Sequence, residues 1–148
     1  MLFRSSKYTI SLSLNDKFSY DATFGLDVAG IGREDASNEH LDAQGQDIVR
    51  ITASSLDNGD YLLWGHNNNS LNSNSTGIPS SYAAGQKYER TWRVQETGEV
   101  GNLTITYDVS SNGFGLTPDY DLLIDVDGDF TNGATIISGS YSGGIVTF

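Results

Sequence analysis

The stretch "GNLTITYDVS", residues 101–110, alternates apolar and polar side chains through its middle. Leu103, Ile105 and Tyr107 fall on one side of an extended chain and the intervening threonines on the other, because successive residues of a strand point to opposite faces. A period of two predicts a β-strand that buries one face in a core.

The same period recurs in other parts of the chain. Further alternating segments are "KYTISLSLN" (7–15), "QDIVRITASSL" (46–56) and "KYERTWRVQETG" (87–98). The segment "DLLIDVD" (121–127) also predicts a strand, with Leu122, Ile124 and Val126 directed into a core. Strands that recur with turn signals every ~8–12 residues are typical of a β-sandwich.

Turn-forming residues separate these segments. Asn58-Gly59 is the strongest short signal for a hairpin. The segment "REDASNEHLDAQGQ" (33–46) contains helix formers without an apolar stripe, so we expect a loop with at most one helical turn. The sequence therefore predicts one all-β domain over residues 1–148, an antiparallel jelly-roll or immunoglobulin-like sandwich of about eight or more strands.

The composition limits the kinds of partner and chemistry. The 148 residues carry 8 basic and 19 acidic side chains, a net charge of −11, so nucleic-acid binding is not expected. The absence of cysteine excludes disulfides and thiolate metal sites. No apolar run approaches the ~20 residues that cross a membrane, so we expect no membrane insertion. The first residues lack a signal peptide's apolar core, and we expect any export signal to lie upstream in a larger parent protein.

Four segments, taken in order, resemble a known family. They are "VAGIGREDAS" (28–37), "YLLWGHNN" (61–68), "RTWRVQETGEVG" (90–101) and "DLLIDVDGDFTNGATI" (121–136). Together they resemble an uncharacterised β-sandwich domain of bacterial cell-surface and secreted proteins, often found beside laminin-G or concanavalin-like modules. The chain departs from that pattern at Glu34, where the family motif has aspartate. The resemblance implies an extracellular location and neighbouring domains in one longer chain, and it implies no known enzymatic activity.

Three aspartates close together raise the question of a metal site. Asp125, Asp127 and Asp129 lie at the end of a predicted strand, and Gly128 permits a sharp turn between them. Ca²⁺ takes 6–8 oxygen ligands from carboxylates, carbonyls and water. Asn132 could complete such a set, which makes these four residues a candidate calcium site.

A solvated Asp-Gly hairpin explains the same residues without a metal. The spacing does not match an EF-hand loop, which needs glycine at its sixth position and glutamate at its twelfth. Here Gly128 falls at the fourth position and Ile136 at the twelfth. Hairpin and calcium site both remain open, and both give the segment a structural role.

Aromatic residues provide a second candidate site. Trp64 and His66 share a face of one predicted strand, Trp92 lies on another, and Tyr82 lies in a polar loop. Rings flanked by asparagine and arginine can form a platform on which a sugar stacks. The alternative is that both tryptophans are core residues and that His66 bonds a backbone carbonyl.

The segment "GIGRED" (30–35) resembles a dinucleotide-binding loop only superficially. Its third glycine, following helix and βαβ context are missing, so we expect its glycines to serve a bulge or a close backbone approach. Arg33 could then pair with a carboxylate such as Glu34, Asp35 or Glu96.

Nothing in the sequence carries a recognisable catalytic motif. The carboxylates Glu89, Glu96, Asp119 and Asp121 stand outside any hydrolase pattern, so we do not expect an enzyme. The first functional hypothesis is a non-catalytic extracellular module of an adhesin-type protein, stabilised by Ca²⁺, whose partners are adjacent domains or a surface protein. The alternatives are a glycan-binding module and a subunit of an extracellular filament assembled by strand pairing.

Overall fold

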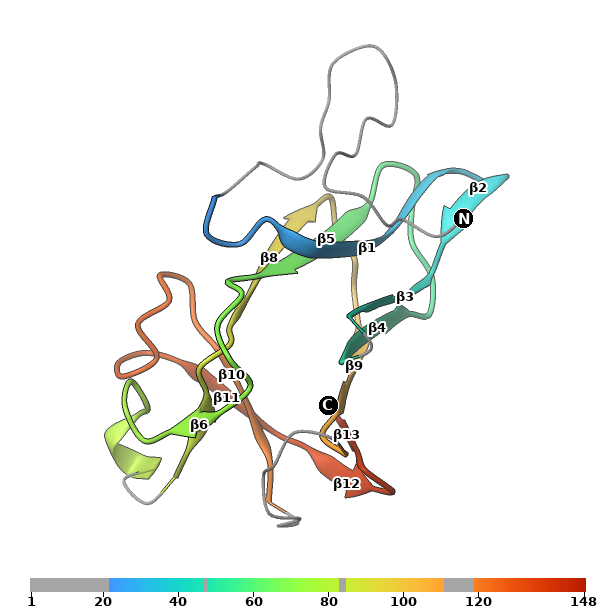
Figure 1. The fold of residues 1–148 in the computed structure, drawn as a ribbon. Helices are drawn as coiled ribbons and strands as arrows, with labels where there is room; N and C mark the ends of the chain where they lie inside the picture. Colours follow the sequence, from blue (N-terminus) through green and yellow to red (C-terminus); the bar gives the residue numbers. More distant parts are fainter. Residues whose placement is uncertain (1–21, 47, 83–84, 111–118) are drawn as a thin grey trace.

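Strand β5 (Tyr61–His66) is buried at every position and lies near the middle of one of two main sheets. It pairs antiparallel with β1 (Leu26–Asp35) on one side and with β8 (Trp92–Thr97) on the other. Strand β2 (Asn38–His40) pairs with β1 and completes a four-stranded sheet. The computed structural model describes residues 22–46, 48–82, 85–110 and 119–148 (Figure 1).

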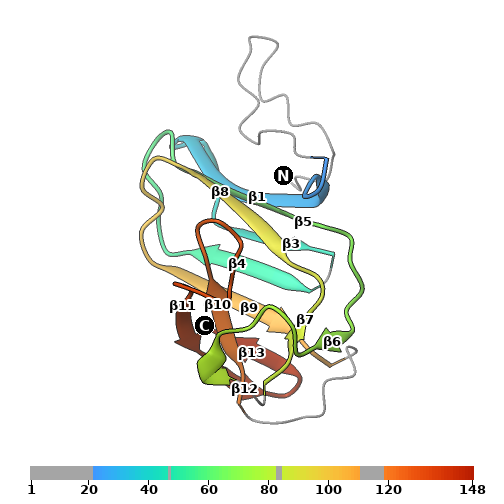
Figure 2. The ribbon, with the colours of Figure 1, turned by 90° about the vertical axis from the view of Figure 1, so that its left-hand side faces the viewer.

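The second main sheet has five antiparallel strands in the order β12-β13-β9-β4-β3. Their bounds are β3 (Asp42–Gly45), β4 (Val49–Ala53), β9 (Leu103–Asp108), β12 (Ser140–Ser142) and β13 (Ile145–Thr147). The two sheets lie face to face, with β1, β5 and β8 in one layer and β4 and β9 in the other (Figure 1, Figure 2). The predicted all-β antiparallel sandwich is confirmed.

Two small ribbons stand outside the main sheets. One pairs β6 (Ser73–Asn74) with β7 (Lys87–Tyr88), and a short 3-10 helix (Ser80–Tyr82) lies between them in sequence. The other pairs β10 (Asp121–Ile124) with β11 (Thr135–Ser138). Neither ribbon shares a ladder with the main sheets within the described residues.

The core forms where the inner faces of the two sheets meet. In β4, Val49, Ile51 and Ala53 are buried while Arg50 is exposed, as the period of two predicts. Leu103, Ile105 and Tyr107 of β9 pack against the same cluster, so the strand predicted from residues 101–110 is confirmed.

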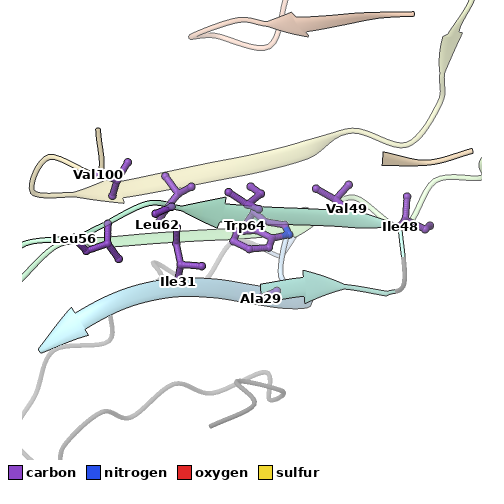
Figure 3. Packing of buried hydrophobic residues seen from close by; sticks show 10 residues of the cluster. Ala29, Ile31, Ile48, Val49, Leu56, Leu62, Trp64 and Val100 are labelled. Carbon is purple, nitrogen blue, oxygen red and sulfur yellow. The ribbon is translucent and has the colours of Figure 1, made fainter. Parts of the chain in front are cut away.

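Trp64 is the largest fully buried side chain, with 1% of its surface exposed. It lies among Ile31 and Leu62 of its own sheet and Val49 of the opposite sheet (Figure 3). Its volume fills the space between the layers, and dense packing of this kind is what a sandwich core requires.

The segment 33–46, expected to be a loop, forms the end of β1 and the strands β2 and β3. The prediction was wrong because these strands rely on backbone ladders and cross-strand polar pairs, which leave no apolar stripe in the sequence. Arg50 of β4 donates to Asp42 of β3, with a 2.7 Å bond from Nε to Oδ1. Asp42 also accepts a hydrogen bond from the Thr52 hydroxyl.

Asn58-Gly59 forms a turn, but it does not form the hairpin that its sequence predicts. The strands on either side, β4 and β5, belong to different sheets and do not pair with each other. Gly59 has a positive φ of 95°, which glycine adopts without strain. The turn therefore carries the chain from one layer of the sandwich to the other.

The prediction that Leu122, Ile124 and Val126 face the core holds at most for Leu122, which is half-buried. Ile124 is 46% exposed and Val126 is fully exposed. The physical reason is that β10 pairs only with β11 among the described residues, so it has no layer of the sandwich above it.

Two further expectations concern the ends and the membrane. The strand predicted over residues 7–15 lies outside the described residues. Among the residues that are described, no helix has the length and apolar character needed to span a membrane.

Replacing Trp64 tests the core directly. We expect Trp64→Ala to lower the free energy of unfolding by about 3–5 kcal/mol, because truncation leaves a cavity between the two sheets. Val94, directly opposite in β8 but 52% exposed, is the matched control, and Val94→Ala should cost less than ~1 kcal/mol. Denaturant unfolding measures both, and equal losses would contradict this description of the core.

Candidate functional site

The aspartate-rich loop, residues 125–134, joins β10 to β11. Hydrogen bonds between its aspartate side chains and its own backbone hold its shape. Asp125 Oδ1 accepts hydrogen bonds from the backbone N–H of Asp127 at 2.9 Å and of Gly128 at 2.7 Å. Asp127 Oδ1 accepts from the Asp129 N–H at 2.9 Å. Asp129 Oδ1 accepts from both the N–H and the hydroxyl of Thr131. Each carboxylate thus closes a turn with the backbone two or three residues on, as aspartate commonly does in loops.

These contacts favour the charged form of Asp125. A side-chain hydrogen bond with Asp127, followed by the backbone N–H groups of Asp127 and Gly128, holds the pKa of Asp125 below its ordinary value. Asn132 joins the loop through its backbone N–H, which donates to the Asp129 carbonyl at 3.2 Å.

The predicted calcium ligands lie in one loop but do not converge. Within the part of the chain that the structure describes, no three acidic or histidine side chains are placed to hold one metal ion. One oxygen of each of the three aspartates is already bonded to backbone N–H, which is the arrangement of the hairpin alternative. The calcium site stays a prediction that binding has to test.

The aromatic candidates divide between the core and its margin. Trp64 and His66 are each 1% exposed, so neither ring offers a face to a ligand. Trp92 is half-buried and meets Tyr107 edge-to-face at 5.2 Å between ring centroids. Tyr82 is also half-buried. Its pKa is raised mainly by burial and, to a smaller extent, by a hydrogen bond to Asp121. The predicted sugar platform is not assembled as one surface.

His66 instead holds two unusual backbone positions together. Its Nε2 lies 2.8 Å from Asp27 Oδ2, and its Nδ1 accepts the backbone N–H of Asn68 at 2.9 Å. Asp27 and Asn68 both have positive φ, at 48° and 58°. Such positions cost free energy in residues other than glycine and persist when neighbouring contacts hold them. The interior alternative paired His66 with a backbone carbonyl, whereas its ring accepts a backbone N–H and bonds the Asp27 carboxylate.

Arg33 binds a carboxylate, as expected, but the partner is different. Its Nη1 lies 3.0 Å from Glu39 Oε1 on β2, and none of the three candidates named from the sequence is bonded to it. The same side chain donates to Asn58 Oδ1 at 2.9 Å and to the Leu56 carbonyl at 3.2 Å. Arg33 therefore ties the edge of the four-stranded sheet to the crossover turn before β5.

Asp60 is the organising residue that sequence reasoning missed. It is 7% exposed, and its two carboxylate oxygens accept the backbone N–H groups of Asp57 and Glu99. These bonds join the turn before β5 to the turn after β8. The only signal in the sequence is an aspartate directly before a buried run, and the partner at Glu99 is 39 residues away.

The neighbouring Tyr61, the first residue of β5, packs against β1. Burial, together with a hydrogen bond from its hydroxyl to Glu34, raises the pKa of Tyr61 to about 12. Its ring also covers Gly32, where a Cβ would collide with it. The close approach expected at the "GIG" glycines is thus confirmed at Gly32.

Two glycines with similar backbones allow a test of the Asp60 anchor. Gly98 and Gly101 both have positive φ, at 77° and 65°, but a Cβ at Gly98 would overlap Asp60 Oδ1 while a Cβ at Gly101 meets nothing within 4 Å. Gly101→Ala should cost about 1–2 kcal/mol of unfolding free energy for its φ alone. Gly98→Ala should cost about 1–3 kcal/mol more, because it displaces a buried carboxylate from its donors. Equal losses in denaturant melts would mean that Asp60 anchors nothing.

Calcium binding has a direct thermal test. If the loop binds Ca²⁺ only when folded, saturation at about 100 times the dissociation constant should add ~2.7 kcal/mol of stability. We expect a higher melting temperature in Ca²⁺ than in EDTA, and Asp127→Ala should abolish the difference. Asp42→Ala, at an acidic residue outside the loop, should preserve it. A melting temperature that does not respond to millimolar Ca²⁺ would reject the site.

Comparison with known proteins places the chain in a family. Neither a curated protein nor a solved structure matches it. A family model described as a domain of unknown function, DUF8202, matches residues 5–148, which is nearly the whole chain. The chain therefore belongs to the DUF8202 family.

Proposed function

We propose that this chain is a non-catalytic module of an extracellular bacterial protein of the adhesin type, which holds or displays neighbouring domains. The observation that carries this proposal is the way the buried polar side chains are bonded. Both carboxylate oxygens of Asp60 accept hydrogen bonds from backbone N–H groups. Both ring nitrogens of His66 are hydrogen-bonded, one to the Asp27 carboxylate and one to the Asn68 N–H. Groups bound in this way fix loops rather than act on a substrate.

The composition supports the same role. The chain is rich in Ser, Thr, Asn and Gly, and the charged fraction is only 18%. A sandwich core joined by polar anchors gives a rigid spacer whose loops can vary. The resemblance of the "GIGRED", "WGHNN" and "DVDGDF" segments to domains of bacterial surface proteins supports the extracellular location.

Calcium fits this proposal as a stiffener of the residue 125–134 loop. Asp127 and Asp129 each keep a second carboxylate oxygen that accepts no backbone N–H within the described residues, whereas Asp125 also interacts with the Asp127 side chain and the Asp129 backbone. A hard cation bound by such oxygens would offset the repulsion between three nearby negative charges.

The ribbon β10–β11 favours a second candidate, a filament subunit that assembles by strand pairing. Neither outer edge of this ribbon has a strand partner among the described residues, and none of its residues is buried. Ile124, Ile136 and Ile137 are 46%, 37% and 40% exposed. Unpaired edges with apolar side chains are templates for strand addition. Assembly that grows with protein concentration in light scattering would favour this candidate over a spacer.

Labelling of intact cells tests the proposed location. An antibody raised against the folded domain should bind unpermeabilised cells of the native bacterium, and external protease should remove the signal. A cytosolic protein detected only after lysis is the control for cell integrity. If the domain is also detected only after lysis, the extracellular proposal fails.

A further inference from the structure

Two Asn-Gly pairs in this chain have similar local chemistry and different tertiary surroundings. Asn58-Gly59 forms the crossover turn before β5, and Asn132-Gly133 ends the aspartate-rich loop. All four residues are exposed, and the two glycines have matched φ values of 95° and 87°. A third pair, Asn112-Gly113, lies outside the described residues.

Asn-Gly pairs are prone to deamidation because glycine has no side chain to obstruct attack by its backbone nitrogen. That nitrogen attacks Cγ of the asparagine, a new C–N bond forms, the Cγ–Nδ2 bond breaks, and ammonia leaves with the proton from the attacking nitrogen. Water then opens the cyclic imide to aspartate or isoaspartate. These reaction steps consume only water, and they need no oxidant or cofactor.

At Asn58-Gly59 the fold holds both reacting groups. The N–H of Gly59 donates to the Arg33 carbonyl at 2.8 Å, and Arg33 Nε donates to Asn58 Oδ1 at 2.9 Å. A hydrogen bond made by the neutral N–H disfavours its loss of a proton, which attack requires. The bond to Oδ1 fixes the asparagine side chain, so Cγ is not free to swing toward the nitrogen.

At Asn132-Gly133 the corresponding restraints are missing. Within the described residues, no hydrogen bond involves the Asn132 side chain or the Gly133 N–H, and the Asn132 backbone N–H donates to the Asp129 carbonyl at 3.2 Å. The reacting groups of this pair are exposed and unheld.

We propose that Asn132-Gly133 is a site at which this protein modifies itself by deamidation, and that Arg33 protects the otherwise similar Asn58-Gly59 turn. An aspartate product at position 132 would place a fourth carboxylate in the loop that holds Asp125, Asp127 and Asp129. The reaction would make the loop more acidic as the protein ages. The proposed reaction does not depend on whether the module is extracellular.

Peptide mapping by mass spectrometry tests the site on the full, folded chain. After incubation in mildly alkaline buffer, aspartate and isoaspartate should accumulate at position 132 while position 58 stays largely intact. In denaturant the two pairs should react at similar rates, because the difference is tertiary. Equal rates in the folded chain, or an unequal ratio that persists in denaturant, would overturn the proposal.

Arg33→Lys tests the protecting residue, since lysine keeps the charge and loses the planar fork that reaches Asn58 and Glu39 together. We expect deamidation at Asn58 to rise by roughly fivefold, the rate equivalent of one net hydrogen bond. The control Glu39→Gln removes the ion pair and keeps the contact with Asn58, and it should leave the Asn58 rate near wild type. The Asn132 rate should stay unchanged in both variants, and a denaturant melt of each variant checks that the fold is intact. An Asn58 rate unaffected by Arg33→Lys would remove Arg33 from the mechanism.

Discussion

The burial of β5, with a polar anchor at each end, is the constraint on which the rest of this sandwich depends. Its inner face carries Trp64, which fills the space between the sheets. Asp60 directly precedes the strand and His66 ends it, and these are the only buried polar or charged residues of the described chain. Burial of such groups costs free energy unless they are bonded, and both Asp60 and His66 have bonded partners. Here each anchor takes its partners from loops, so the position of β5 also fixes those loops.

The two anchors, Asp60 and His66, explain why several turns adopt conformations that their local sequences do not predict. Asp60 joins the turn before β5 to the turn after β8, and Gly98 is needed there because a side chain would occupy the place of the carboxylate. His66 holds Asp27 and Asn68 in positive-φ positions that flank the other end of the strand. Both buried polar residues of the described chain are therefore bonded to groups that fix its loops. Arg33 likewise fixes the crossover turn through its hydrogen bonds to Asn58 and Leu56. The bond to Asn58 is the one proposed to slow deamidation there.

The ribbon β10–β11 differs from the main sheets in its burial and in the contacts that fix its loop. It has no buried residue, and its loop is closed by local aspartate contacts rather than by distant partners. Local contacts of this kind depend on residues that are close in the sequence, so the residues of the loop are enough to predict a turn. They do not predict its surroundings: Ile124 and Val126 alternate as core residues do, yet both are exposed because no second layer covers them within the described residues.

The sequence by itself determined the all-β class and the inner faces of β4 and β9, because a period of two is a local property that burial of one face imposes. It also indicated the close approach at Gly32. Only the tertiary structure decided that residues 33–46 form edge strands, that Asn58-Gly59 crosses between sheets, and that Trp64 and His66 are interior residues. These outcomes depend on contacts such as Asp60 with Glu99 and Asp27 with His66, which join residues 39 positions apart. No local pattern encodes such a pairing, since it exists only once the two layers have come together.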